Sequence, residues 1–217
     1  MLIDSPNAPL IYNFTASQTG ADSHWKIQSN SDVTLGRLVD NGAGGQVAQG
    51  VQLQAVAELH IQAGTKSITV PAGSKLSVSG DNSRLRLQGG ELQIVGSLLA
   101  GATFDGSGQT GWTGRSAVVD VAGSSIQIGG LGPDASGTLV TRGGLLQATG
   151  QILLGTSSAT SEILINSLST LETMPAAASA LAVTTPTPEI RFTSAGALRV
   201  HGVVNASGTG ADLNATA

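Results

Sequence analysis

The sequence predicts an all-β fold, a three-sided parallel β-solenoid with about 27 residues per coil. Two patterns and the composition support this class of fold. Short apolar alternations, separated by Gly, Ser, Asn or Asp, run through most of the chain and are typical of strands between turns. Similar segments also recur at a fixed spacing. The chain has 30 Gly but only 3% aromatic and 11% charged residues, so thin layers of aliphatic side chains must form its core.

The spacing is clearest in two segments of equal length. Residues 89–101 (GGELQIVGSLLAG) align with residues 143–155 (GGLLQATGQILLG), two predicted coils later, and seven of the thirteen positions are identical. Half of that spacing places Val119, Asp120 and Val121 between the two segments. A repeated unit that buries its apolar side only by stacking on its neighbours is the sequence signature of a solenoid.

Three apolar rows can be followed at this spacing, one for each side of a coil. The rows contain Leu85, Trp112, Leu139, Ile165 and Phe192; Leu92, Val119, Leu146, Leu171 and Leu198; and Leu98, Ile126, Ile152 and Val204. We expect each row to stack inside the solenoid. The residue after each member of the second row must then face solvent, because successive side chains of a strand alternate. That outward row is polar and contains Gln93, Asp120, Gln147, Glu172 and Arg199.

Glycine marks the predicted corners between strands. Gly96, Gly123, Gly150 and Gly202 recur between apolar segments, and we expect them to take the positive φ that tight corners often need. Stacking pairs the backbone groups of each coil with the coils above and below it. About eight coils fit in the chain, which gives a rod of about 38 Å at a strand spacing of about 4.8 Å.

Two regions depart from the repeat. Residues 1–50 repeat poorly and are interpreted as irregular or N-terminal coils, whereas residues 51–217 supply the solenoid coils. Within the coils, residues 175–188 (PAAASALAVTTPTP) replace a corner glycine with Pro175. We interpret this segment as a loop excursion, with a short embedded helix as the alternative. The first residues lack the basic and apolar regions of a signal peptide, so we expect targeting signals elsewhere in a longer polypeptide.

A family resemblance rests on residues 89–101, 143–155 and 194–210 (SAGALRVHGVVNASGTG). These segments resemble the repeats of filamentous-haemagglutinin-like exoproteins and related large autotransported adhesins, over about residues 50 to 210. The resemblance implies a right-handed parallel β-helix that is exported across an outer membrane to the bacterial cell surface. It also implies partners: other segments of the same polypeptide, and a glycan or protein receptor on host cells, other bacteria or surfaces.

Composition argues against several classes of partner. A net charge of -4 with 10 Lys and Arg, and no basic cluster, argues against nucleic acid. No apolar run approaches the length of a membrane span, about 18 residues, so we predict no membrane insertion. The absence of Cys removes disulfides, thiolate metal sites and cysteine nucleophiles together.

No motif predicts a catalytic, cofactor-binding or metal site. Residues 106–111 fit G-x-G-x-x-G, but residues 112–114 (WTG) follow instead of a helix, so we interpret the motif as a turn. Residues 129–134 fit one copy of the calcium-binding nonapeptide G-G-x-G-x-D, and one copy cannot complete a calcium shell. The three histidines, His24, His60 and His201, are far apart and have no metal or triad spacing, and His201, beside Gly202, is interpreted as a surface residue.

The alternative function is a polysaccharide lyase or hydrolase, or a glycan-binding module. Asp120 and Glu172 share the outward row and would lie about 9.6 Å apart, at two strand spacings. Inverting glycosidases hold their carboxyl groups about 6.5 to 9.5 Å apart, and no aromatic platform for a sugar accompanies this pair. An ice-binding face would need Thr in successive coils, which the outward row lacks. We therefore predict a structural or adhesive segment of a large secreted or surface-anchored exoprotein, and not an enzyme.

Overall fold

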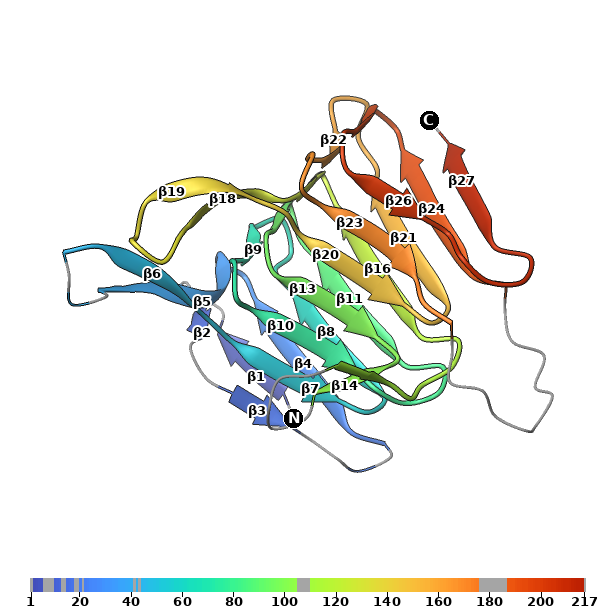
Figure 1. The fold of residues 1–217 in the computed structure, drawn as a ribbon, viewed down its shortest axis with the longest axis horizontal. Helices are drawn as coiled ribbons and strands as arrows, with labels where there is room; N and C mark the ends of the chain where they lie inside the picture. Colours follow the sequence, from blue (N-terminus) through green and yellow to red (C-terminus); the bar gives the residue numbers. More distant parts are fainter. Residues whose placement is uncertain are drawn as a thin grey trace.

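A computed structural model gives the fold and describes residues 2–5, 10–12, 15–17, 20, 22–40, 42, 44–104, 110–175 and 187–216. These residues form a parallel β-helix, in which the chain passes through three parallel sheets in turn (Figure 1). The strands are short because turn residues interrupt each apolar alternation after three to eight residues. The predicted all-β solenoid is confirmed.

Each sheet takes one strand from every coil. The first sheet contains, in spatial order, β1 (Leu2–Ser5), β4 (His24–Ser29), β8 (Glu58–Gln62), β11 (Arg84–Gln88), β16 (Val118–Gly123), β21 (Gln151–Thr156), β24 (Glu189–Ser194) and β27 (Asp212–Thr216). The second sheet contains β2 (Leu10–Tyr12), β5 (Val33–Asp40), β9 (Ile68–Val70), β12 (Glu91–Ile94), β17 (Ser125–Ile128), β22 (Glu162–Ile165) and β25 (Ala197–Val200). The third sheet contains β3 (Thr15–Ser17), β7 (Gln52–Ala55), β10 (Lys75–Val78), β13 (Ser97–Ala100), β20 (Leu145–Ala148), β23 (Thr170–Thr173) and β26 (Val203–Asn205).

Coil length varies along the rod. Glu58 pairs with Arg84 one coil later, and Lys75 pairs with Ser97. The first of these coils is close to the predicted repeat and the second is slightly shorter. Ser97, in contrast, pairs with Leu145, so the next coil is roughly twice as long as its predecessor, because two hairpins leave the chain between these residues.

Three hairpins leave the coils within the described residues. β5 runs on into an antiparallel hairpin with β6 (Gln46–Gly50), and the other two hairpins are β14 (Ala102–Phe104) with β15 (Thr110–Trp112) and β18 (Gly130–Pro133) with β19 (Leu139–Arg142). Figure 1 shows β5–β6 and β18–β19 projecting from the rod side by side, and β6 contacts β18. The excursion predicted at residues 175–188 lies outside the described residues, except for residues 175, 187 and 188.

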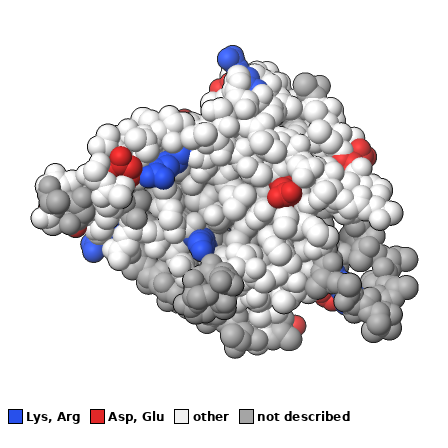
Figure 2. Space-filling view, viewed as in Figure 1, with Lys and Arg blue, Asp and Glu red and all other residues white. Residues whose placement is uncertain are grey.

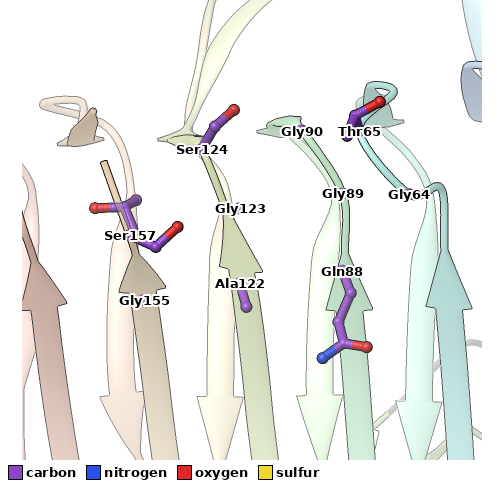
Figure 3. Close-up of a pocket in the computed structure, with 11 residues that line it drawn as sticks. Gly64, Thr65, Gln88, Gly89, Gly90, Ala122, Gly123, Ser124, Gly155 and Ser157 are labelled. Atoms are coloured by element: carbon purple, nitrogen blue, oxygen red, sulfur yellow. The ribbon is translucent and has the colours of Figure 1, made fainter. Parts of the chain in front are cut away.

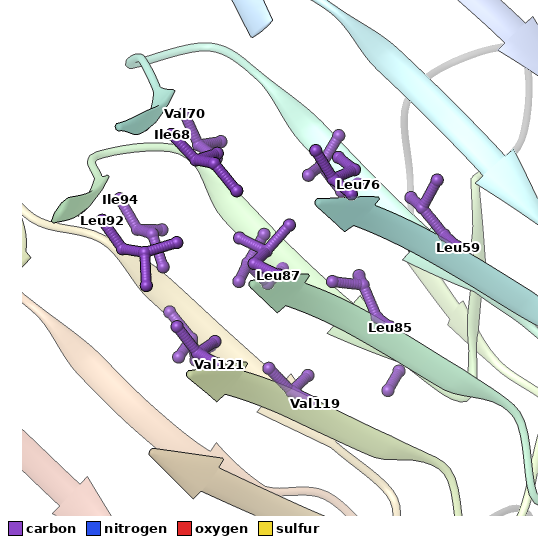
Figure 4. Packing of buried hydrophobic residues seen from close by; sticks show 14 of the residues in the cluster. Leu59, Ile68, Val70, Leu76, Leu85, Leu87, Leu92, Ile94, Val119 and Val121 are labelled. Atoms are coloured by element: carbon purple, nitrogen blue, oxygen red, sulfur yellow. The ribbon is translucent and has the colours of Figure 1, made fainter. Parts of the chain in front are cut away.

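Aliphatic columns run through the inside of the rod (Figure 4). On the first sheet, Leu59, Leu85 and Val119 are successive register partners, and Ile152 and Ile190 continue the same column. All five side chains are fully buried. Burial of one such side chain stabilises the fold by about 1.5–3 kcal/mol, so each coil is held mainly by the coils that cover it.

The predicted rows are wrong, because most of their members are not register partners. The alternation of inward apolar and outward polar side chains along each strand is right. Leu146 and Leu171 do stack on each other in the third sheet. The other members of their row lie on different sides of the rod: Val119 on the first sheet, and Leu92 and Leu198 on the second. Hairpins of unequal length shift the chain, so a constant step along the sequence moves from one side of the coil to another.

The remaining two rows fail for the same reason. Trp112 and Leu139 lie in hairpin strands β15 and β19 and not in the solenoid. The other members are divided among the three sheets: Leu85, Phe192 and Ile152 on the first, Ile165 and Ile126 on the second, and Leu98 and Val204 on the third. The outward row is divided likewise, with Asp120 on the first sheet, Gln93 and Arg199 on the second, and Gln147 and Glu172 on the third.

Gly96, Gly150 and Gly202 lie between strands as predicted and Gly123 ends β16, but the predicted reason for glycine is wrong. None of the four has a positive φ. A Cβ at Gly202 would instead lie 2.5 Å from the carbonyl oxygens of Asn166 and Ser169 in the preceding coil. Close approach of stacked backbones therefore requires glycine there. Positive φ occurs at other glycines, both where the chain leaves a coil for a hairpin, as at Gly101 and Gly129 with φ of 88°, and at other corners, as at Gly64 and Gly73.

Candidate functional site

The first sheet carries a group of paired charges on its outer face. Asp120 of β16 accepts a hydrogen bond from Nε of Arg86 at 3.1 Å and pairs with the guanidinium of Arg84 at 3.1 Å. Both arginines lie on the neighbouring strand β11, and the Asp120 side chain is only 17% exposed. Asp120 is thus a partner in a cross-strand ion pair, which stabilises adjacent strands.

Glu172 lies on the third sheet and has partners of its own. Its carboxylate accepts hydrogen bonds from Nε2 of Gln147 at 3.1 Å and Nδ2 of Asn205 at 3.0 Å, on the two flanking strands. The predicted spacing of about two strands between Asp120 and Glu172 is therefore wrong, because the two carboxylates lie on different sheets. They cannot flank one sugar ring.

The histidines do not come together as a site. His24 lies 3.4 Å from a carboxylate oxygen of Glu58 on the next strand, and Nε2 of His60 lies 3.0 Å from the amide oxygen of Gln88. Burial lowers the pKa of His60, and the hydrogen bond to Gln88 opposes that effect. His201 is exposed just after β25. Among the described residues, no group of three His, Asp or Glu side chains could hold a metal ion.

The two glycine motifs have structural surroundings where they are described. In the first, residues 106–109 lie outside the described part of the chain, and Thr110 and Gly111 belong to the antiparallel strand β15. In the second, Asp134 caps a turn by accepting hydrogen bonds from the backbone N–H groups of Ser136 at 2.8 Å and Thr138 at 3.0 Å. The Ser136 hydroxyl is the main cause of the lowered pKa of Asp134. The Asp134 carboxylate therefore stabilises the turn of its own loop.

A shallow groove of about 620 Å³ follows the corner between the first and second sheets (Figure 3). It spans four successive coils and has no charged side chain in its lining, which consists of Gly64, Thr65, Gln88, Gly89, Gly90, Ala122, Gly123, Ser124, Gly155, Thr156 and Ser157. A Cβ at Gly90 would lie 2.2 Å from the carbonyl oxygen of Thr65. Tight stacking of the coils thus accounts for much of this glycine run.

The C-terminal end of the rod is open. Leu213 and Val200 occupy inward positions, because they are the register partners of the fully buried Ile190 and Ile165. They are nevertheless 53% and 43% exposed, because no described strand covers them. The last strands of the three sheets, β27, β25 and β26, each have one edge without a partner strand in the described structure.

Charges are sparse on the surface shown in Figure 2, where Lys, Arg, Asp and Glu occur singly or as adjacent opposite charges among other residues. No helix in the described part of the chain has the length and apolar character needed to cross a membrane. No protein-family profile, curated protein or solved structure matches the chain. The surfaces of the rod itself therefore indicate what the chain can do.

Proposed function

We propose that this chain is a structural and adhesive segment of a larger bacterial surface protein, a length of rod on which further coils stack. The open C-terminal end carries this proposal. Inward aliphatic side chains and unpaired strand edges together form a surface that a further parallel coil would cover, and repeat proteins require either such a coil or a cap.

The topology indicates what the covering element looks like. β27 lies on the first sheet and begins a new coil beyond β25 and β26. The next two strands in chain order would cover β25 on the second sheet and β26 on the third. Two short parallel strands with apolar side chains facing inward would thus complete the coil that β27 begins.

Export and adhesion rest on other features. The resemblance of the repeats to filamentous-haemagglutinin-like exoproteins supports an extracellular or cell-surface location, and the absence of Cys suits export through an oxidising compartment. Hairpins that project from a rigid rod offer surfaces for a host-cell or glycan receptor. No observation favours the lyase or hydrolase alternative, since its two carboxylates lie on different sheets.

The rod proposal is tested by adding the missing strands. A copy of residues 89–100, which supply β12 and β13 in their own coil, is appended after Ala217. The appended strands are expected to raise Tm by about 4 °C or more, because they bury Val200 and its neighbours and about 1 kcal/mol corresponds to about 2–4 °C in a chain of this size. A scrambled copy of the same segment is the control, and an equal Tm for both variants would contradict the proposal.

The enzyme alternative is tested by turnover. Incubation with pectate or alginate is expected to yield neither new reducing ends nor unsaturated products. Turnover that disappears on replacing Asp120 or Glu172 would overturn the structural function and promote the alternative.

A further inference from the structure

We infer that the outer face of the second sheet holds a binding site for a neutral, hydroxyl-rich sugar. This inference deepens the adhesive part of the proposed function and rests on it. The site is a cleft of about 330 Å³ over strands β9, β12 and β17, at the lower end of the usual range of about 300–1,000 Å³ for ligand pockets. We call it the second-sheet cleft, and its lining is Ser67, Thr69, Glu91, Leu92, Gln93, Ser125 and Gln127.

Register brings these polar side chains together from three consecutive coils. Thr69, Gln93 and Gln127 are direct partners across β9, β12 and β17, and Glu91 is the partner of Ser125. All of them alternate with buried aliphatic residues and so project outward. Neighbouring strands lie about 4.8 Å apart, so the two outward rows form a compact polar surface.

Apart from Ser67, whose hydroxyl donates to Asp32 at 2.8 Å, the polar side chains of the second-sheet cleft are not used by the fold. Within the described residues, the side chains of Thr69, Glu91, Gln93, Ser125 and Gln127 make no hydrogen bond to another residue. Polar side chains that line a pocket without protein partners remain available to a ligand or to water.

Three outward amides elsewhere on the rod are paired with a neighbouring coil. Gln147 donates to Glu172 at 3.1 Å, Gln151 donates to Glu189 at 2.9 Å, and the amide of Gln88 meets His60 at 3.0 Å. In those places, hydrogen bonds between neighbouring coils satisfy the side-chain amides. Gln93 and Gln127 are also register partners, yet they do not bond to each other.

The β18–β19 hairpin borders the second-sheet cleft. A Cβ at Gly130, the first residue of β18, would lie 2.6 Å from Nε2 of Gln93 and 3.4 Å from Nε2 of Gln127. The base of the hairpin therefore lies directly against both amides, and glycine at position 130 leaves the room that they occupy. The base of this excursion thus packs against two of the amides that line the cleft.

The donor and acceptor set identifies the class of ligand. Amides and hydroxyls both donate and accept, and the Glu91 carboxylate accepts from two hydroxyl groups, which suits the hydroxyl pattern of a sugar. No Lys or Arg lines the second-sheet cleft, and Glu91 would repel a uronate, sulfate or phosphate group. The same features therefore favour a neutral glycan over an acidic one.

Binding to a panel of immobilised neutral hexasaccharides of glucose, galactose and mannose tests the inference. The unmodified chain is expected to bind at least one of them, and Glu91→Ala with Gln93→Ala is expected to weaken that binding at least tenfold. Gln147→Ala, an outward amide of the third sheet, is the matched control and should leave binding unchanged. All these substitutions face outward, so unchanged far-ultraviolet circular dichroism and thermal melting show that the variants remain folded.

Three outcomes would overturn the inference: no binding to any neutral hexasaccharide, binding that persists in the double variant, or stronger binding to alginate than to the neutral panel. None of them alters the melting experiment with the appended strands, so failure of the sugar site is distinguishable from failure of the rod.

Discussion

Val118 and Val119 are neighbours in β16, yet Val119 is fully buried whereas Val118 projects outward between Arg84 and Gln151. The strand thus has valine at two adjacent positions, one facing the core and the other facing outward. The column around Val119 is aliphatic, so a carboxylate there would be buried without a partner. On the outer face the same carboxylate would meet water and the guanidinium of Arg84.

We therefore expect Val119→Asp to destabilise the chain by more than about 4 kcal/mol, or to prevent folding, because it buries an unpaired charge. Val118→Asp is expected to change stability by no more than about 0.5 kcal/mol. Urea unfolding of the two variants measures the difference, and similar losses in both would mean that the inward and outward faces of β16 are assigned the wrong way round.

A second residue-scale prediction concerns Glu189, whose side chain is only 8% exposed. Burial acts to raise its pKa, but hydrogen bonds from Asn214, Arg191 and Gln151 outweigh burial and hold the pKa below its ordinary value of 4.5. The folded chain therefore keeps Glu189 ionised where the unfolded chain protonates it, and this contribution to stability is lost as pH falls below about 4.5.

We expect Glu189→Gln to lower Tm at pH 7, with the difference from the unmodified chain shrinking as pH falls from 5 to 3. Thermal melting across that range measures the effect. Glu162→Gln, at an exposed pair with Arg199, is the control and should show little difference at any pH. A Tm difference for Glu189→Gln that stays constant with pH would contradict the linkage.

Among the elements, the glycines at strand ends differ in whether another residue could replace them. At Gly129, where β18 leaves the coil, φ is 88° and a Cβ would lie 2.3 Å from Cγ of Asn166. At Gly155, at the end of β21, φ is not positive and a Cβ would meet nothing within 4 Å. The two glycines therefore differ in both backbone conformation and space.

Gly129→Ala is accordingly expected to lose about 1–3 kcal/mol, since it combines backbone strain with a steric clash. Gly155→Ala should be neutral or stabilising by a few tenths of a kcal/mol to about 1 kcal/mol, because it reduces the freedom of the unfolded chain. Chemical denaturation of both variants measures the change in their free energies of unfolding. Equal losses would show that crowding at position 129 is not what requires glycine.

The same elements show which parts of the fold were predictable. Inside and outside followed from alternation, because Leu-x-Leu segments such as residues 85–87 need one buried face. The register of the strands could not be predicted, because the strands on all three sides of a coil have the same alternating pattern. Residues 89–101 pass from the second sheet to the third, whereas the aligned residues 143–155 pass from the third to the first.

The second-sheet cleft could not be predicted from the sequence for a related reason. Gln93 was correctly predicted to face outward, but its partners Thr69 and Gln127 can be named only once the register is known. Gly130, which packs against both amides, belongs to a sequence motif that resembles a calcium repeat. Only the packing of that glycine against two amides shows its role.

At the scale of the whole molecule, stability is distributed along one dimension. Each coil touches mainly its neighbours, so the rod is the sum of its coils and their interfaces. The C-terminal coil has a neighbour on one side only within the described structure. Its exposed inward side chains and unpaired strand edges together form a surface that favours association with other molecules.

We expect Leu213→Lys to reduce concentration-dependent association while changing Tm by less than about 2 °C, because position 213 is half exposed. Ile190→Lys, at its buried register partner, is the matched control and should prevent folding. Sedimentation and melting separate the two effects. Association that is unchanged in Leu213→Lys would mean that molecules do not associate through the open end.

The hairpins have a further consequence for engineering. They leave the rod at the second-to-third and third-to-first corners, whereas the first-to-second corner turns without a hairpin in the described coils and is packed with glycine. A Cβ at Gly123 would already lie 2.7 Å from the carbonyl oxygen of Gly90, so an inserted segment could not leave there without separating two coils. Foreign peptides or epitopes are therefore best grafted at the tip of β18–β19. There a rigid scaffold would display the graft away from its own surface while the coils beneath it stay in contact.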